Sequence, residues 1–127
     1  MKTILVDALQ TFVTETEGIS GPLHELLDEY ENTKIILTNA DDAKAPSLHL
    51  DEMPYEVYTR KVYPKSEPEY YEGVLEHYKL TPEQVVYIEH SPTAAQAAED
   101  AGILTHYFDP EEKDIESVKE FLDAQLY

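Results

Sequence analysis

Short runs of aliphatic and β-branched residues alternate with stretches of helical periodicity along the whole chain of 127 residues. This alternation is typical of a parallel sheet, because each parallel strand needs a long crossover connection, usually a helix. Five strands are expected, at residues 3–6, 34–37, 56–59, 85–88 and 103–107. The pattern therefore predicts one α/β domain over residues 1–127, with a Rossmann-like, five-stranded parallel sheet and helices on both faces.

Capping sequences mark where the helices of this domain should begin. A serine precedes a proline near residue 20, and Ser66-Glu67-Pro68-Glu69 has the form of a capping box. A second, shorter capping signal lies at residues 81–84, and Ser91-Pro92 opens an alanine-rich helix that Gly102 should end. Residues 8–20 are expected to be irregular, and a short helix is expected at residues 41–45.

The charge of the chain excludes several classes of partner. Nine Lys and Arg residues against 27 Asp and Glu residues give a formal net charge of −18. The field of such a protein repels nucleic acid and anionic membranes, so neither is an expected partner. The absence of cysteine excludes disulfides and thiolate catalysis and agrees with a cytoplasmic location. Nothing in the sequence indicates an oligomeric state.

Polar residues stand where three of the expected strands end. Asp7 follows the first strand, Thr38 and Asn39 follow the second, and Glu89-His90 follows the fourth. Lys65 precedes the helix that comes after the third strand. Ligands of open parallel sheets bind at the carboxyl ends of the strands. Four separate segments should therefore place functional groups on one rim.

The order of these residues resembles the motifs of the haloacid dehalogenase (HAD) superfamily over nearly the whole chain. The first motif of that family is Asp-x-Asp-x-Thr, which Asp7 and Thr11 match, with Leu9 in the place of the second aspartate. A threonine after an apolar strand is matched by Thr38, and a lysine before a helix by Lys65. The fourth motif, a strand with an acidic end, a serine and an alanine-rich helix, follows the outline of residues 88–103.

The resemblance implies a role for each matched residue. Asp7 would attack phosphorus and form an aspartyl-phosphate. Thr38 would donate a hydrogen bond to the phosphoryl oxygens, and Lys65 would supply positive charge, as phosphoryl transfer requires. Thr11 and Asn39 would contact the substrate, which would be a small phosphorylated molecule or a phosphoprotein.

Two residues depart from the family pattern. Leu9 cannot transfer a proton, and a missing general acid typically costs about 10²- to 10⁴-fold in rate. His90 stands where the family usually has an aspartate that binds magnesium, an ion that prefers oxygen ligands, whereas imidazole suits zinc, copper, iron or nickel. Asp7, Glu89 and His90 are the candidate metal ligands. A Mg²⁺ site, a transition-metal site and no site all remain open, and no organic cofactor is expected.

The spacing of the motifs leaves little room for the cap domain that many HAD enzymes carry. Residues 8–37 and 40–64 are the only intervals in which it could be inserted, and both are short. The resemblance thus predicts a capless hydrolase of phosphatase type with weak or lost activity. One alternative is an inert HAD-like module that binds a partner or has a structural role. A third is metal-independent, dehalogenase-type hydrolysis, although Ala94 and Ala95 stand where that branch carries another aspartate.

Overall fold

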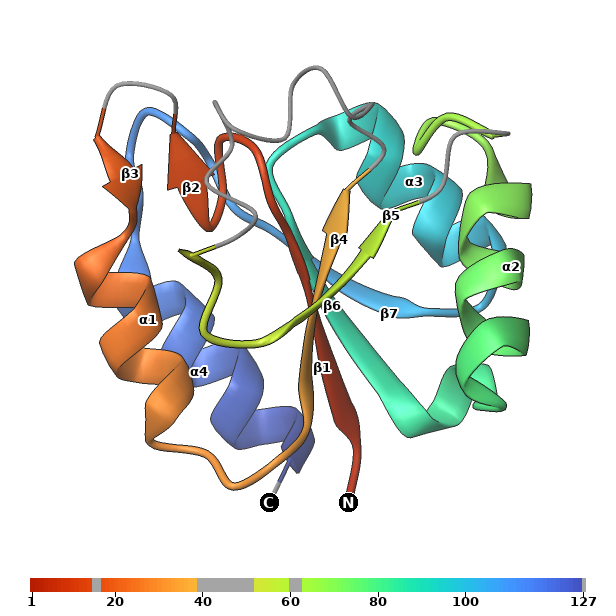
Figure 1. Ribbon diagram of the computed structural model, residues 1–127, viewed down its shortest axis with the longest axis horizontal. Helices are drawn as coiled ribbons and strands as arrows, with labels where there is room; N and C mark the ends of the chain where they lie inside the picture. Colours follow the sequence, from red (N-terminus) through yellow and green to blue (C-terminus); the bar gives the residue numbers. More distant parts are fainter. Residues whose placement is uncertain (15–16, 39–51, 60–62, 127) are drawn as a thin grey trace.

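The computed structural model describes residues 1–14, 17–38, 52–59 and 63–126 (Figure 1). Its main feature is the predicted sheet of five parallel strands, which run in the order β5-β4-β1-β6-β7. The strands are β1 (Thr3–Asp7), β4 (Lys34–Thr38), β5 (Glu56–Thr59), β6 (Val85–Glu89) and β7 (Leu104–Tyr107). The chain winds outward from β1 to β5 and returns to β6 beside β1, so the topological switch point lies between β1 and β6.

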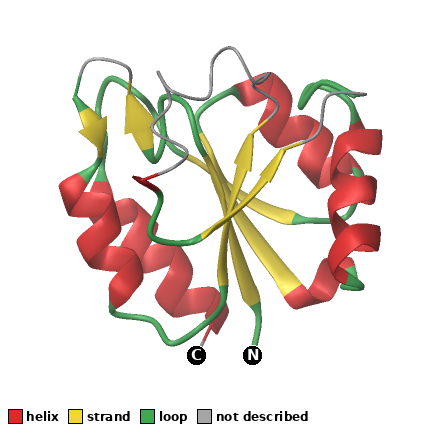
Figure 2. Ribbon diagram, in the orientation of Figure 1, coloured by secondary structure: helices red, strands yellow, loops and turns green. Residues whose placement is uncertain are grey.

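Four α-helices in the described part of the chain cover the two faces of this sheet. In Figure 2, α1 (Gly21–Asp28) and α4 (Ile115–Leu126) lie on one side, and α2 (Pro68–Tyr78) and α3 (Pro92–Asp100) lie on the other. Each face has its own apolar core, because successive side chains of a strand point to opposite faces. Ile4 and Val6 of β1 pack with α1 and α4, whereas Leu5 packs with α2 and α3. The predicted α/β fold with helices on both faces is confirmed.

Most of the predicted helix ends are confirmed, but the start of α2 is not. The Ser20 hydroxyl accepts a hydrogen bond from the backbone N–H of Leu23, and Gly102 has a left-handed φ of 91°. The last residue before α2 is Glu67, not the predicted Ser66, and its side chain makes no capping hydrogen bond. The helix begins one residue later than predicted because Ser66 lies inside a turn, in which the Glu67 N–H donates to the Pro64 carbonyl. Glu67 is then the last extended residue, and α2 begins at Pro68.

The stretch expected to be irregular, residues 8–20, contains a small antiparallel hairpin of β2 (Val13–Thr14) and β3 (Gly18–Ile19). Strands of two residues are too short to leave a periodic pattern in the sequence, and the prediction was wrong for that reason. The short helix expected at residues 41–45 lies outside the described residues. No helix in the described part of the chain is long and apolar enough to cross a membrane.

Candidate active site

Asp7 is the last residue of β1 and lies at the switch point of the sheet, with only 2% of its surface exposed. The chain turns sharply after it. The Ala8 N–H donates to the Leu37 carbonyl, the N–H groups of Phe12 and Val13 donate to the Ala8 carbonyl, and Gln10 has a left-handed φ of 69°. This compact turn, called the nucleophile loop (residues 8–12) below, brings the chain back toward Asp7.

Three side chains from separate segments contact the carboxylate of Asp7. The Thr11 hydroxyl donates to Oδ2 at 2.7 Å, and Nδ1 of His90 lies 2.5 Å from the same oxygen. The ammonium group of Lys65 donates to Oδ1. The structure thus brings together four of the residues that the motifs singled out, although Lys65 and His90 are 58 and 83 positions from Asp7 in the sequence.

Lys65 is held in place by a second partner. Its ammonium group also donates to the backbone carbonyl of Leu37, at 2.7 Å. Leu37 is the residue that pairs with Asp7 in the register of β1 and β4. The cation is therefore fixed above the ends of two neighbouring strands, and its side chain is only 12% exposed.

Glu89 and His90 complete the group from the end of β6. Glu89 is 1% exposed; its Oε1 accepts a hydrogen bond from the Tyr87 hydroxyl at 2.5 Å, and its Oε2 accepts one from the Ser91 N–H at 3.0 Å. Nδ1 of His90 lies 3.1 Å from Glu89 Oε2 as well as 2.5 Å from Asp7 Oδ2. The imidazole therefore sits between the two buried carboxylates.

These contacts shift the pKa values of Asp7 and His90 in opposite directions. Burial alone would raise the pKa of Asp7, but the charge of Lys65 and the hydrogen bonds from His90 and Lys65 lower it to about 2. Hydrogen bonds to Asp7 and Glu89 raise the pKa of His90 to about 9, against the effect of burial. At neutral pH Asp7 is therefore a carboxylate and His90 an imidazolium, so the two form an ion pair.

The remaining candidates lie on the same rim or outside the described residues. Thr38 is the last residue of β4, is buried, and accepts a hydrogen bond from the Tyr70 hydroxyl at its backbone carbonyl. It lies one residue beyond Leu37, the partner of Asp7 in the sheet. Asn39 is not among the described residues. Leu9 is half-buried in the nucleophile loop and offers no proton donor.

Sequence reasoning missed the tyrosines that support this rim. Tyr87 orients Glu89, and Tyr70 holds the end of β4. The signal for Tyr87 was present, because residues two apart in a strand point to the same face, and Tyr87 precedes Glu89 by two. No comparable spacing relates Tyr70 to Thr38, which are 32 residues apart and come together only through the tertiary structure.

Asp7, Glu89 and His90 form a group that could hold a metal ion, since one ligand atom from each lies within 4.8 Å of the others. The donor set fits magnesium poorly, because Nδ1 of His90 occupies the space between the carboxylate oxygens that such an ion would bridge. Lys65 and His90 already lie against these carboxyl groups, and their positive charges would repel a divalent cation. A metal would require His90 to move or to bind it through a deprotonated Nδ1.

Comparison with solved structures places this architecture among known folds. The sequence matches no model of a protein family and no curated protein. The structure is similar to a HAD-superfamily hydrolase of subfamily IA, variant 1, from Geobacter sulfurreducens PCA, with a TM-score of 0.67 and 16% identity over 83% of this chain and 88% of that one.

Two further solved structures extend the likeness. A HAD-superfamily hydrolase from Ehrlichia chaffeensis is similar over 100% of both chains, with a TM-score of 0.61 and 13% identity. A HAD family enzyme from Bacteroides thetaiotaomicron, in complex with magnesium and inorganic phosphate, is similar over 84% of this chain and 93% of that one, with a TM-score of 0.64 and 14% identity. The chain therefore has the fold of the HAD superfamily, as the order of its motifs predicts.

Proposed function

We propose that this protein is a HAD-type hydrolase that acts by phosphoryl transfer, with Asp7 as the nucleophile. The observation that carries the proposal is the state of Asp7: a buried carboxylate at the switch point, kept ionised by Lys65 and His90. A carboxylate must be ionised to attack phosphorus. The likeness in fold to HAD hydrolases supports the same reaction class.

The contacts of Asp7 suggest which oxygen attacks. Thr11 and His90 both hold Oδ2, whereas Oδ1 has one contact among the described residues, with Lys65. A carboxylate oxygen accepts about two hydrogen bonds, so Oδ1 retains a lone pair. We assign the attack to Oδ1, with Lys65 beside it to neutralise charge on the transferring group.

In the proposed reaction, the bond from Oδ1 of Asp7 to phosphorus forms as the bond to the leaving oxygen breaks. Water then hydrolyses the aspartyl-phosphate, which releases inorganic phosphate and restores Asp7. Leu9 offers no proton to the leaving oxygen, so that oxygen takes its proton from another source, such as water. Turnover should be slow, by about 10²- to 10⁴-fold relative to a site with a general acid, and should favour esters whose leaving groups need little protonation.

The proposed substrate is a small phosphorylated molecule or a phosphoprotein. Among the described residues between β1 and β4, the chain forms only the β2–β3 hairpin and α1. An open rim without an inserted cap would admit a large substrate as readily as a small one. The Asp7, Glu89 and His90 group does not fit magnesium as it stands.

The same contacts support a second candidate function, an inert HAD-like module that binds a partner or has a structural role. A buried, hydrogen-bonded group in which Lys65 and His90 pair with the carboxyl groups of Asp7 and Glu89 can stabilise a fold without any reaction. Leu9 favours this candidate because it removes the proton partner that hydrolysis would use.

One assay separates the candidates. Phosphate release from aryl and alkyl phosphate esters, and halide release from 2-haloacids, would be measured with and without Mg²⁺, Mn²⁺ and Zn²⁺. We expect slow release of phosphate, faster from the aryl esters, that falls by at least about 10²-fold in Asp7→Asn. Asp100→Asn, an exposed and remote aspartate, should retain the rate.

The other outcomes of this assay also distinguish the candidate functions. Turnover that Asp7→Asn leaves unchanged would rule out Asp7 as the nucleophile. A folded protein without any turnover would support the inert module, and metal-free release of halide would support the dehalogenase. Leu9→Asp restores the missing acid, so the proposal predicts a gain of at least about tenfold toward alkyl esters.

A further inference from the structure

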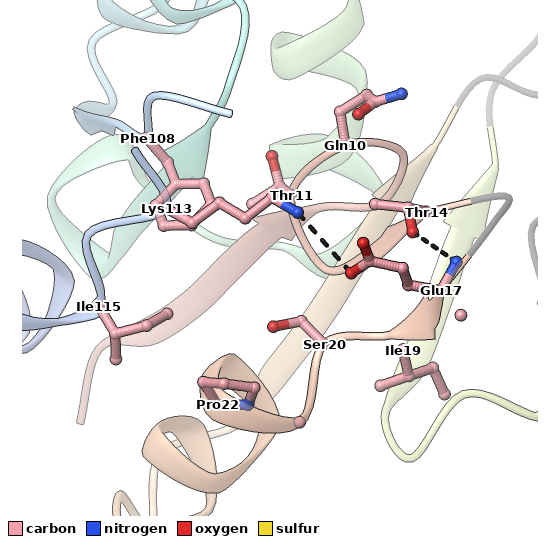
Figure 3. A pocket seen from close by; sticks show the side chains of 12 residues that line it. Gln10, Thr11, Thr14, Glu17, Ile19, Ser20, Pro22, Phe108, Lys113 and Ile115 are labelled. Atoms are coloured by element: carbon pink, nitrogen blue, oxygen red, sulfur yellow. Dashed lines mark hydrogen bonds and ion pairs between the residues drawn. The ribbon is translucent and has the colours of Figure 1, made fainter. Parts of the chain in front are cut away.

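A cavity of about 320 Å³ lies beside the nucleophile loop and shares one residue, Thr11, with the group around Asp7 (Figure 3). Four segments form its walls: the nucleophile loop, the β2–β3 hairpin, the start of α1 and the segment between β7 and α4. Its volume is near the lower end of the roughly 300–1,000 Å³ typical of ligand sites, so it suits a small molecule.

One part of this cavity is apolar and firmly held. Phe108 is 3% exposed and packs in the core beneath α1 and α4, and Ile19 and Ile115 are partly buried against the same core. Pro22, in the first turn of α1, adds another apolar surface. A ring or a short aliphatic group could be buried there without any rearrangement of the core.

The rim of the cavity carries one charge of each sign. Figure 3 shows Lys113 and Glu17 pointing toward each other, with Nζ of Lys113 3.8 Å from Oε2 of Glu17. Their side chains are 49% and 74% exposed, and ion pairs exposed to this degree contribute only about 0–1 kcal/mol. Neither charge is therefore committed to the other, and a ligand can displace the pair at little cost.

We propose that this cavity binds a small zwitterion with an apolar side group, the chemistry of a free apolar amino acid. The carboxylate of the ligand pairs with Lys113, its ammonium group pairs with Glu17, and its side group packs on Phe108 and Ile19. A ligand with a single charge would be attracted by one of these residues and repelled by the other. The proposal goes beyond the hydrolase function and does not depend on it.

Three probes that differ only in their charged groups test the proposal. L-phenylalanine has both charges, 3-phenylpropanoate lacks the ammonium group, and phenethylamine lacks the carboxylate. Each would be titrated into ¹⁵N-labelled protein and followed by the backbone amide resonances. We expect L-phenylalanine to shift amides of residues 10–11, 17–21, 108–109 and 111–115, and to bind about two- to fivefold more tightly than either analogue.

Matched variants identify the charges that recognise the ligand. Lys113→Gln should weaken L-phenylalanine and 3-phenylpropanoate by about two- to fivefold and leave phenethylamine unaffected or stronger. Glu17→Gln should do the reverse for the two analogues. Lys79→Gln is the control for the first variant, because Lys79 is also an exposed lysine with a left-handed backbone, and Glu83→Gln is the control for the second.

The proposal is overturned if L-phenylalanine shifts no amides, or shifts amides scattered over the surface. It is also overturned if all three probes bind equally, since the charges would then play no part. Asp7→Asn should bind L-phenylalanine as the wild type does, so the outcome is independent of whether the protein hydrolyses phosphate esters.

Discussion

At the scale of single residues, Asp7 depends on cations that arrive from distant parts of the chain. A nearly fully buried carboxylate is costly unless it is paired and hydrogen-bonded. Lys65 and His90 supply the charge, and Thr11 supplies a neutral donor. The same contacts thus serve stability and the proposed chemistry. Two predictions measure the contributions of His90 and Lys65 to stability.

The first prediction concerns pH. His90 holds its proton more tightly in the folded protein, with a pKa of about 9, than at its ordinary value of 6.5. Its contribution to stability is therefore complete below about pH 6.5 and is lost as the pH rises through about 9. We expect the wild type to lose about 2 kcal/mol of unfolding free energy over this range relative to His90→Asn, as measured by urea denaturation. An equal decline in both proteins would contradict the prediction.

The contribution of Asp7 to stability depends on pH in the opposite sense to that of His90. The pKa of Asp7 is lowered to about 2 from an ordinary value of 3.8, so its contribution is present above about pH 4 and is lost as the pH falls toward 2. The contribution of the Asp7–His90 ion pair to stability should therefore be complete between about pH 4 and 6.5.

The second prediction is a double-mutant cycle on Asp7 and Lys65. Lys65→Met removes the ammonium group and should lower the free energy of unfolding by about 3 kcal/mol, because the buried carboxylate loses a main partner. Adding Asp7→Asn removes the stranded charge, so the double variant should be more stable than the sum of the single changes predicts. Chemical denaturation measures the free energy of unfolding of the wild type, the two single variants and the double variant. Additive effects would show that the two residues are not energetically coupled.

At the scale of elements, the capping residues decide where helices begin. Ser20 and Ser91 each accept a hydrogen bond from the N–H three residues on, as their sequences predict. Ser66 has the same sequence signature but lies inside a turn, one residue too early. The signature is therefore necessary for a cap of this kind but not sufficient, because the preceding turn sets which residue is the last extended one.

The third prediction compares two of these serines. Ser20→Ala removes the cap of α1 and should lower the free energy of unfolding by about 1 kcal/mol. Ser66→Ala should change it by less than about 0.5 kcal/mol, since Ser66 is exposed and does not cap α2. Thermal or urea denaturation of both variants checks this. A larger loss for Ser66→Ala than for Ser20→Ala would mean that the start of α2 has been placed wrongly.

At the scale of the whole molecule, the net charge of −18 opposes folding through self-repulsion. The carboxyl groups at the switch point are paired with Lys65 and His90, so the excess negative charge lies elsewhere on the protein. Interactions between exposed charges are screened over about 30 Å at 0.01 M salt and over about 3 Å at 1 M.

The fourth prediction follows from this screening. Raising NaCl from about 10 mM to about 500 mM should raise the Tm by about 3–5 °C, which corresponds to roughly 1 kcal/mol for a chain of this size. Differential scanning calorimetry measures the change, and KCl should give the same rise because screening does not depend on the identity of the cation. A Tm that is unchanged or lower at high salt would show that self-repulsion is not the dominant electrostatic effect.

The sequence alone determined the five strands of the main sheet, their parallel arrangement and the polar residues at the ends of β1 and β6. These features are local, because each can be recognised from a few neighbouring residues. They are the strand and helix periodicity, the caps, and the polar residues at the ends of Ile4–Val6 and Val85–Ile88. The family resemblance added that the order of Asp7, Thr38 and Lys65 along the chain matches a known set of motifs.

Only the tertiary structure decided which of those residues touch one another and what they do to each other's charge. His90 was a candidate metal ligand in the sequence, but the pairing of β1 with β6 puts its Nδ1 between Asp7 and Glu89, where it acts as a cation. The cavity between Lys113 and Glu17 likewise joins segments almost a hundred residues apart. The physical reason is the same in both cases: charge interactions depend on distance and burial, and these are properties of the packed sheet and not of the sequence near any one residue.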